Sequence, residues 1–267
     1  MSAYYNENDP FAVAWLRELI KDGLIADGIV DDRSILDVEA SDLTGFDQHH
    51  FFAGIGGWSY ALRLAGWADN RSVCTASLPC QPFSVAGKGE GKNDERHLLP
   101  HFMQLVREFD FNTIMGEQVE AAIRHGWLDD IQAEMGRENY STGAVVLGAH
   151  SVNAPHKRQR VYWIAERMGN AEQQRLEGLP GYVNKQGGRA AEVRSCSETG
   201  FWSNTNTAYC RDGKHRPIPT ESALFPVLFD GFSNRVGALR GAGNAIVPAV
   251  GAEVIKAYMG YDNEKMY

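Results

Sequence analysis

The chain has 267 residues, of which 43% are hydrophobic, so it can form one domain with a full core and a small appendage. It lacks both an apolar run of about 18 residues, which excludes a membrane-spanning helix, and a signal-peptide pattern, so a cytoplasmic location is expected. The net charge of −8 argues against nucleic-acid binding, although residues 151–240 hold 13 Lys or Arg against 8 Asp or Glu and could face either phosphates or only water.

The chain alternates strand-like and helix-like segments up to about residue 167. Apolar runs that end at glycine or proline predict strands, and apolar residues at helical spacing predict amphipathic helices. The expected strands are YYNENDP at 4–10, HHFFAGIGG at 49–57, SVCTASLP at 72–79, NTIMGEQV at 112–119, AVVLGAH at 144–150 and RVYWIAER at 160–167. The expected helices cover 11–21, 58–67 (with Gly66 as its stop), 97–109 and 124–136. This alternation predicts a mainly parallel α/β sheet.

The rest of the chain has a different composition. Residues 168–235 are rich in Gly, Asn, Ser and Thr, and they predict a small irregular module. Residues 236–267 return to a helical pattern over 243–259. We therefore expect one domain over 1–167, the small module over 168–235, and a C-terminal segment that rejoins the first domain.

A glycine loop follows the second predicted strand. In Phe52-Ala53-Gly54-Ile55-Gly56-Gly57 the glycines allow backbone N–H groups to approach a ligand closely. Many α/β proteins have such a turn for packing alone, so this stretch by itself is equally consistent with ligand binding and with a purely structural turn.

Reactive side chains follow the ends of three other predicted strands. Cys80, in PCQPFS, lies between a strand and a glycine-rich, charged loop, where it could act as a nucleophile. Glu117 ends the next strand, and Arg158 and Arg160 begin another. Because strand ends of a parallel sheet meet at one edge, a thiol, a carboxyl and an arginine would surround one small planar substrate. Taken singly, they are as consistent with a buried thiol, a surface carboxylate and a solvated basic turn.

Together these stretches resemble the DNA cytosine-5 methyltransferases. The resemblance rests on FAGIGG, PCQPFS, a Glu after an apolar strand, HKRQR and a late GNAIVP, and it covers nearly the whole chain except the irregular module. It implies a Rossmann-like S-adenosylmethionine-dependent methyltransferase fold with an antiparallel strand in a mainly parallel sheet. It also implies methyl transfer from S-adenosylmethionine to C5 of cytosine in DNA, through a covalent Cys80–C6 adduct on a flipped-out base.

The resemblance also implies a role for each matching residue. Cys80 would be the nucleophile, Glu117 would bind the N3 and N4 edge of the base, Arg160 would hold the O2 side, and Arg158 would support it or touch phosphate. Glu7 would bind the ribose hydroxyls of the cofactor, and the module at 168–235 would recognise the target. The other cofactor-binding candidates are Phe52, Gly54, Ile55, Gly56, Gly57, Asn8, Ser34, Ile35 and Asn244. The DNA-binding candidates are Gln81, Ser84, Arg96, Arg189, Arg194, Arg211, Lys214 and Arg216.

The order of the segments departs from the family. Only 21 residues separate Gly57 from Pro79, which leaves room for one helix and one strand. Two segments near the start of this sequence instead resemble the missing parts. YYNENDPFAVAWLREL resembles the family's acidic strand with its helix, and DDRSILDVEASDL resembles the end of its adenine-side strand. We therefore expect a circular permutation; the alternative is an unrelated extension over 1–46. If the helix after the glycine loop keeps its face, its crossover becomes left-handed, against a strong rule.

Three residues also depart from the family pattern, and several functions stay open. Asn8 stands where an apolar or aromatic residue is usual, Gln118 replaces an Asn, and His156 replaces a Gln. The alternatives are a tRNA cytosine-5 methyltransferase, the same thiol chemistry with another one-carbon donor such as a folate, and an inactive DNA-binding homologue. The four cysteines form no C-x-x-C pair, so no metal is expected. The expected partner is double-stranded DNA, with a cognate restriction endonuclease left open as a second partner. The protein is expected to be a monomer and away from membranes.

Overall fold

The computed structural model describes residues 2–78, 98–152, 154, 157–169, 205–209, 215–219 and 244–264. The elements, in chain order, are β1 (Ala3–Asn6), α1 (Pro10–Lys21), β2 (Gly28–Asp31), the 3-10 turns η1 (Ile35–Asp37) and η2 (Ala40–Leu43), β3 (Gln48–Phe51), α2 (Gly57–Ala65), β4 (Val73–Ala76), α3 (Leu99–Phe109), β5 (Thr113–Val119), η5 (Glu120–His125), α4 (Trp127–Arg137), β6 (Tyr140–Leu147), η6 (Ala149–Val152), β7 (Arg160–Arg167), β8 (Thr205–Tyr209), β9 (His215–Pro219) and α6 (Pro248–Glu264). In these ranges, no helix has both the length and the apolar character that crossing a bilayer requires.

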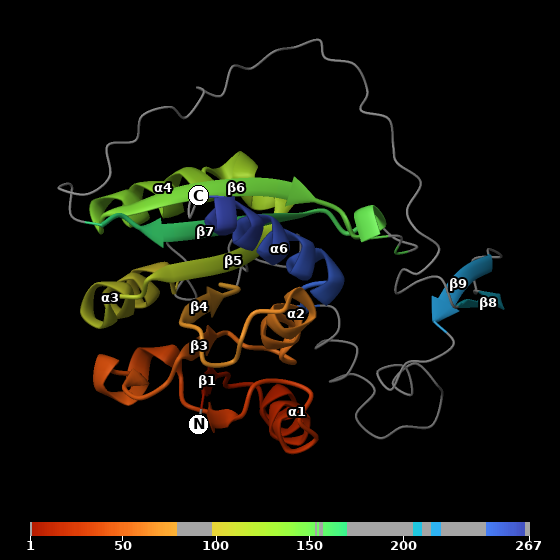
Figure 1. Cartoon of the computed structure of the whole chain (residues 1–267), viewed down its shortest axis with the longest axis horizontal. Helices are drawn as coiled ribbons and strands as arrows, with labels where there is room; N and C mark the ends of the chain where they lie inside the picture. Colours follow the sequence, from red (N-terminus) through yellow and green to blue (C-terminus); the bar gives the residue numbers. More distant parts are fainter. Residues whose placement is uncertain are drawn as a thin grey trace, which may run out of the picture.

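Seven strands form one sheet in the order β2-β1-β3-β4-β5-β7-β6 (Figure 1). The first five in this order run parallel, and β7 runs antiparallel to both of its neighbours. This arrangement confirms the predicted fold class, a mainly parallel α/β sheet with an antiparallel strand. Strands β8 and β9, which fall in the predicted irregular module, pair as an antiparallel hairpin.

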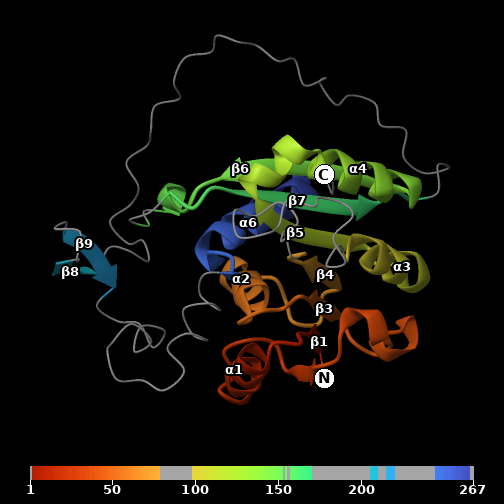
Figure 2. The same cartoon turned by 180° about the vertical axis from the view of Figure 1, so that it is seen from behind.

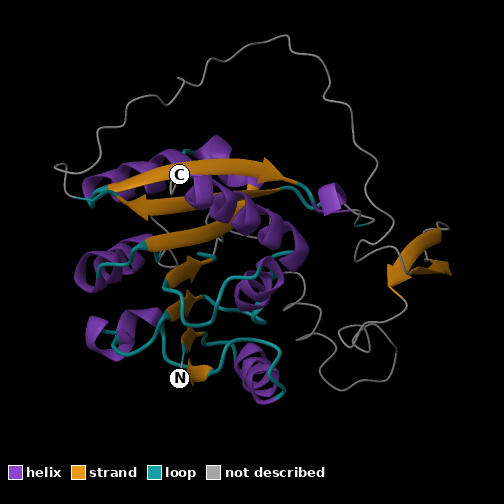
Figure 3. Ribbon diagram, in the orientation of Figure 1, coloured by secondary structure: helices purple, strands orange, loops and turns teal. Residues whose placement is uncertain are grey.

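Helices cover both faces of the sheet, as Figure 3 shows by element type and Figure 2 from behind. Neighbouring residues on a strand point to opposite faces, and β1 shows which helices share a face. The hydroxyl of Tyr5 lies 2.9 Å from the hydroxyl of Ser59 on α2, in the layer that contains α1. Tyr4 points the other way, into the apolar cluster of Ile35, Leu43 and the buried residues of α3 and α4. Helix α6 packs on α2 in the first layer.

The β3–α2–β4 crossover differs in hand from the other parallel crossovers. From β1 to β2 the chain moves toward one end of the sheet with α1 on the first face. From β3 to β4 it moves the opposite way, yet α2 lies on the same face as α1 (Figure 1). The crossovers from β2 to β3 and from β4 to β5 also move that way, but through η1, η2 and α3 on the second face. Since right-handed crossovers are the rule, the α2 crossover is the left-handed one.

The local sequence explains where two helices begin and end. The side chain of Asp9 accepts hydrogen bonds from the N–H groups of Phe11 and Ala12, which starts α1 with Pro10 in its first turn. Gly66, with a φ of 84°, ends α2 as predicted. Helix α6 begins at Pro248, later than the predicted residue 243, because a proline disfavours helical backbone in the residue before it and suits the first turn of a helix.

Candidate active site

One edge of the sheet collects most of the candidate residues that the structure describes. The parallel strands β1 to β5 all end at this edge, and β7 begins there because it runs the other way. The register pairs Val119 at the end of β5 with Arg160 at the start of β7. Glu7, the loop at 52–57 and Glu117 therefore all lie along the same edge as Arg160.

Glu7 is bound to the glycine loop. Its Oε2 accepts a hydrogen bond from the backbone N–H of Gly54 at 2.8 Å, and its Oε1 accepts one from the N–H of Asp9 at 2.9 Å. The register of β1 and β3 places Asn6 opposite Phe51, so the two strand ends are level. The carboxylate is thus fixed beside the loop, and each oxygen keeps a further lone pair for a ligand.

The glycine loop has a backbone that most residues avoid. Gly54 and Gly56 have φ values of 55° and 80°, and Phe52, which is not a glycine, has a φ of 53°. A Cβ on Gly56 would lie 3.2 Å from the side chain of Leu19, so this position must stay small. Among the described residues, a Cβ on Gly54 would meet nothing nearer than the Phe52 carbonyl oxygen at 4.0 Å, so none of them fills the space above this glycine. The loop therefore packs on α1 below and leaves room above.

The adenine-side candidates follow β2. The hydroxyl of Ser34 accepts a hydrogen bond from the N–H of Leu36 at 3.3 Å and caps the turn η1. Ile35 is 4% exposed and belongs to the apolar cluster against which Phe52 packs. Asn8, after Glu7, is exposed. Ile35 and Phe52 thus join one apolar cluster, whereas Ser34 and Asn8 are polar.

Glu117 and Arg160 form an ion pair further along the same edge. The Nε atom of Arg160 lies 2.7 Å from Oε1 of Glu117, whose side chain is 8% exposed. Opposite charges in direct contact at a buried position hold the pair together. Burial raises the pKa of Glu117, and the charges of Arg160 and Arg158 oppose this only in part. The pKa of this carboxyl is thus higher than that of an exposed Glu.

Arg158 joins β7 to the C-terminal segment. Its Nη2 donates a hydrogen bond to the carbonyl of Ala245 at 2.5 Å, and its φ of 32° is unusual for a residue other than glycine. Burial, followed by the charge of Arg160, lowers the pKa of Arg158. On the same segment Ile246 lies 3.0 Å from where a Cβ on Gly57 would stand. These contacts bring the segment that begins with Asn244, which is itself exposed, to the glycine loop.

Two contacts at the end of β4 escaped sequence reasoning. Gln118 is buried, and its amide donates a hydrogen bond to the carbonyl of Leu78 at 3.1 Å. The indole of Trp58 donates one to the hydroxyl of Ser77 at 3.0 Å. Gln118 was identified only as a departure from the family pattern, and its position after Glu117 was the only available signal. Both contacts fix the point where the chain leaves β4 toward Cys80.

The remaining candidates fall elsewhere. Cys80, Gln81, Ser84, Arg96, Arg189, Arg194, Arg211 and Lys214 lie outside the described residues. The backbone of Arg216 lies on β9, opposite Ala208. Among the described residues, His, Cys, Asp and Glu side chains form no group that could hold a metal ion.

Comparison with known proteins identifies relatives of this chain. Residues 69–199 match the family model described as C-5 cytosine-specific DNA methylase. Type II methyltransferase M.AplI of Arthrospira platensis is 27% identical over 150 residues, which cover 43% of this chain and 44% of that protein. Type II methyltransferase M.HhaI of Haemophilus parahaemolyticus is 26% identical over 172 residues, or 50% and 53%. The chain thus spans about half the length of these relatives.

A solved structure shows a weaker likeness. The structure described as Entamoeba histolytica methyltransferase EhMeth superposes with a TM-score of 0.43 at 14% identity, covering 65% of this chain and 47% of that one.

Proposed function

We propose that this chain, which belongs to the C-5 cytosine-specific DNA methylase family, transfers a methyl group from S-adenosylmethionine to C5 of cytosine in DNA. The observation that carries the proposal is the buried ion pair of Glu117 and Arg160 at the same sheet edge as the contact of Glu7 with Gly54. One end of that edge suits a ribose and the other suits the polar edge of a base.

The cofactor region has donors and acceptors that suit S-adenosylmethionine. The Glu7 carboxylate, held by two backbone N–H groups, can accept hydrogen bonds from the two ribose hydroxyls. The open space above Gly54 can admit a ligand close to the backbone, and Ile35 with Phe52 offers an apolar wall to an adenine. When bound, the cofactor would supply an electrophilic methyl group.

The base end suits the activation of a cytosine. C5 of cytosine is a poor nucleophile, and a thiolate from Cys80 that bonded to C6 would make C5 enamine-like once N3 is protonated. Glu117, whose raised pKa favours the protonated form, would give N3 that proton, while Arg160 would hold Glu117 and the O2 side of the base. Transfer of the methyl group to C5 would leave S-adenosylhomocysteine. N3 would then return its proton to Glu117, and loss of the C5 proton to water with cleavage of the carbon–sulfur bond would release 5-methylcytosine and return the thiolate.

We also infer that the order of segments is circularly permuted. Strands β1 and β2 precede β3 in sequence, yet they lie beyond β3 in the sheet and bring Glu7 to the glycine loop. The family match begins at residue 69, after that loop, as a changed order of the preceding segments would produce. Permutation preserves stability when the same contacts form in space.

The test is transfer of radiolabel from S-adenosylmethionine to double-stranded DNA. We expect labelled DNA with the wild type and none with Cys80→Ser, and bisulfite sequencing should locate the mark at cytosine in a fixed context. Label in tRNA and none in DNA would replace the DNA substrate with RNA. DNA binding without label in either would favour an inactive homologue. The description of both relatives as Type II methyltransferases supports a role beside a restriction endonuclease.

A further inference from the structure

The segment that joins β2 to β3 is acidic around a single cation. Arg33 is the only Lys or Arg between Lys21 and Arg63 in the sequence. Five carboxylates surround it along the chain: Asp31, Asp32, Asp37, Glu39 and Asp42. Apart from the turns η1 and η2, no regular element shapes the segment, so its conformation depends on side chains.

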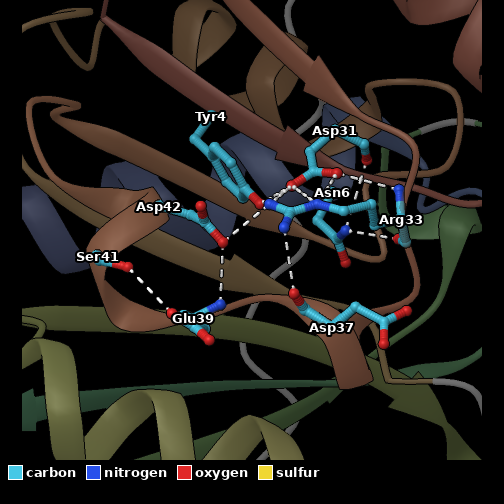
Figure 4. Close-up of polar contacts among 8 residues, drawn as sticks. All are labelled: Tyr4, Asn6, Asp31, Arg33, Asp37, Glu39, Ser41 and Asp42. Carbon is cyan, nitrogen blue, oxygen red and sulfur yellow. Dashed lines mark hydrogen bonds and ion pairs between the residues drawn. The ribbon is translucent and has the colours of Figure 1, made fainter.

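The guanidinium of Arg33 bonds to the start, the middle and the end of this segment (Figure 4). Its Nε and Nη2 donate to the carboxylate of Asp31, with the shortest distance 2.6 Å. Nη2 also donates to Oδ2 of Asp42 at 2.8 Å, and Nη1 donates to the carbonyl of Asp37 at 3.2 Å. One planar group thus closes the segment into a loop, which the rigid fork of Arg can do and the point charge of Lys cannot.

Strand β1 fixes the same loop from inside (Figure 4). The hydroxyl of Tyr4 donates to Oδ2 of Asp31 at 2.5 Å, and the amide of Asn6 donates to the carbonyl of Arg33 at 3.0 Å. Both side chains are buried. Burial alone would raise the pKa of Asp31, but the bonds from Arg33 and Tyr4 lower it to about 2, so this carboxylate stays charged. The loop is therefore tied to β1, the strand that directly precedes Glu7.

We propose that Arg33 is a positioning residue of the cofactor site, which fixes the adenine-side turn at Ser34 and Ile35 relative to the ribose-binding Glu7. The inference rests on the proposed function. Ser34 and Ile35 follow Arg33 directly, and every bond that its guanidinium makes to a described residue stays within the loop. Arg33 therefore acts through the turn and leaves the DNA-facing end of the sheet edge unaffected.

Calorimetry with S-adenosylhomocysteine and steady-state kinetics with DNA test this role. Arg33→Ala should raise the Kd for S-adenosylhomocysteine and the KM for S-adenosylmethionine about tenfold, while kcat and the KM for DNA stay within about twofold of the wild type. The Kd for S-adenosylhomocysteine and the KM for S-adenosylmethionine of Arg33→Lys should lie between those of the wild type and those of Arg33→Ala. Arg17→Ala is the matched control, because it removes an exposed ion pair with Asp32 of the same loop, and it should change neither constant.

The possible failures are distinguishable. A wild type that binds no S-adenosylhomocysteine would end both the proposed function and this inference. A wild type that binds it, with Arg33→Ala and Arg33→Lys binding equally well, would overturn the inference alone. Thermal unfolding of each variant reports whether it is folded; if Arg33→Ala is not, Arg33→Lys and Tyr4→Phe decide. If the KM for DNA rises in these folded variants as much as the KM for S-adenosylmethionine, Arg33 is a general structural residue and the proposal is contradicted.

Discussion

The carboxylate of Glu7 accepts a hydrogen bond from the backbone N–H of Gly54 at 2.8 Å, although 47 positions separate the two residues in the sequence. This contact joins the front of the chain to the glycine loop. It also fixes a charged group beside backbone N–H groups and open space, which is an arrangement for holding a polar ligand. The proposed cofactor site depends on it.

Replacing Glu7 tests the cofactor site. Glu7→Ala removes both the ribose acceptor and the partner of Gly54, and we expect the Kd for S-adenosylhomocysteine to rise at least about tenfold by calorimetry. Glu18→Gln, at an exposed position on α1, is the control and should bind like the wild type. Unchanged binding by Glu7→Ala would remove Glu7 from the site.

The raised pKa of Glu117 predicts a pH-dependent rate. The proposed reaction needs the protonated carboxyl, so kcat should fall as the pH rises through its pKa. Glu117→Gln cannot supply a proton, and we expect kcat to drop about a hundredfold and this pH limb to disappear. The exposed Glu120→Gln should keep both the rate and the limb. A pH profile shared by the wild type and Glu117→Gln would assign the proton to another group.

A buried histidine predicts sensitivity of the fold to acid. Burial, with a smaller effect of His49, lowers the pKa of His50 to about 3, whereas the pKa of a histidine in the unfolded chain is about 6.5. The unfolded state therefore binds more protons between these values. The contribution of neutral His50 to the free energy of unfolding should be fully present above about pH 6.5. As the pH drops from there toward 3, this free energy should fall by at most about 1.4 kcal/mol per pH unit.

Urea unfolding at several pH values measures this contribution. His50→Gln removes the titration while keeping a partner for Thr75, which lies 2.8 Å from the ring. We expect its free energy of unfolding to change less between neutral pH and pH values near 5 than that of the wild type. The exposed His101→Gln should behave as the wild type. An equally steep loss in His50→Gln would place the acid sensitivity elsewhere.

Gly116, beside the catalytic candidate Glu117, must remain a glycine. A Cβ there would lie 2.2 Å from Cε2 of the buried Trp163. We expect Gly116→Ala to cost about 1 to 3 kcal/mol of unfolding free energy and to lower activity by moving β5 against β7. Gly143→Ala on β6 is the matched control, because a Cβ there meets nothing within 4 Å. Equal stabilities of the two variants would show that Trp163 moves aside freely.

The sequence predicted the sheet well because its signals are local. Apolar runs between glycines and prolines located six of the seven strands of the sheet, although β6 begins at Tyr140 and not at residue 144. Strand β2 at Gly28–Asp31 has no such run and was missed by this pattern. The end of α2 at Gly66 followed from one residue. The placement of Glu7 beside the glycine loop was also predicted, from the resemblance of the first segment to the family's acidic strand.

The face taken by α2 and the side-chain networks could not be predicted. The contact of Ser59 on α2 with Tyr5 on β1 joins residues 54 positions apart, and no periodicity reports such a contact. The bonds of Tyr4 to Asp31 and of Gln118 to Leu78 join residues 27 and 40 positions apart. Such contacts depend on side-chain directions that only the assembled sheet defines.

Trapping a covalent complex tests the central claim most directly. Duplex DNA carrying 5-fluorocytosine at the methylated position, incubated with the protein and S-adenosylmethionine, should yield a complex that survives denaturation, because the fluorine at C5 cannot leave as a proton does. Mass spectrometry should locate the crosslink at Cys80, and Cys80→Ser should form none. Methylated cytosine without a trapped complex, or a crosslink at another residue, would contradict the mechanism.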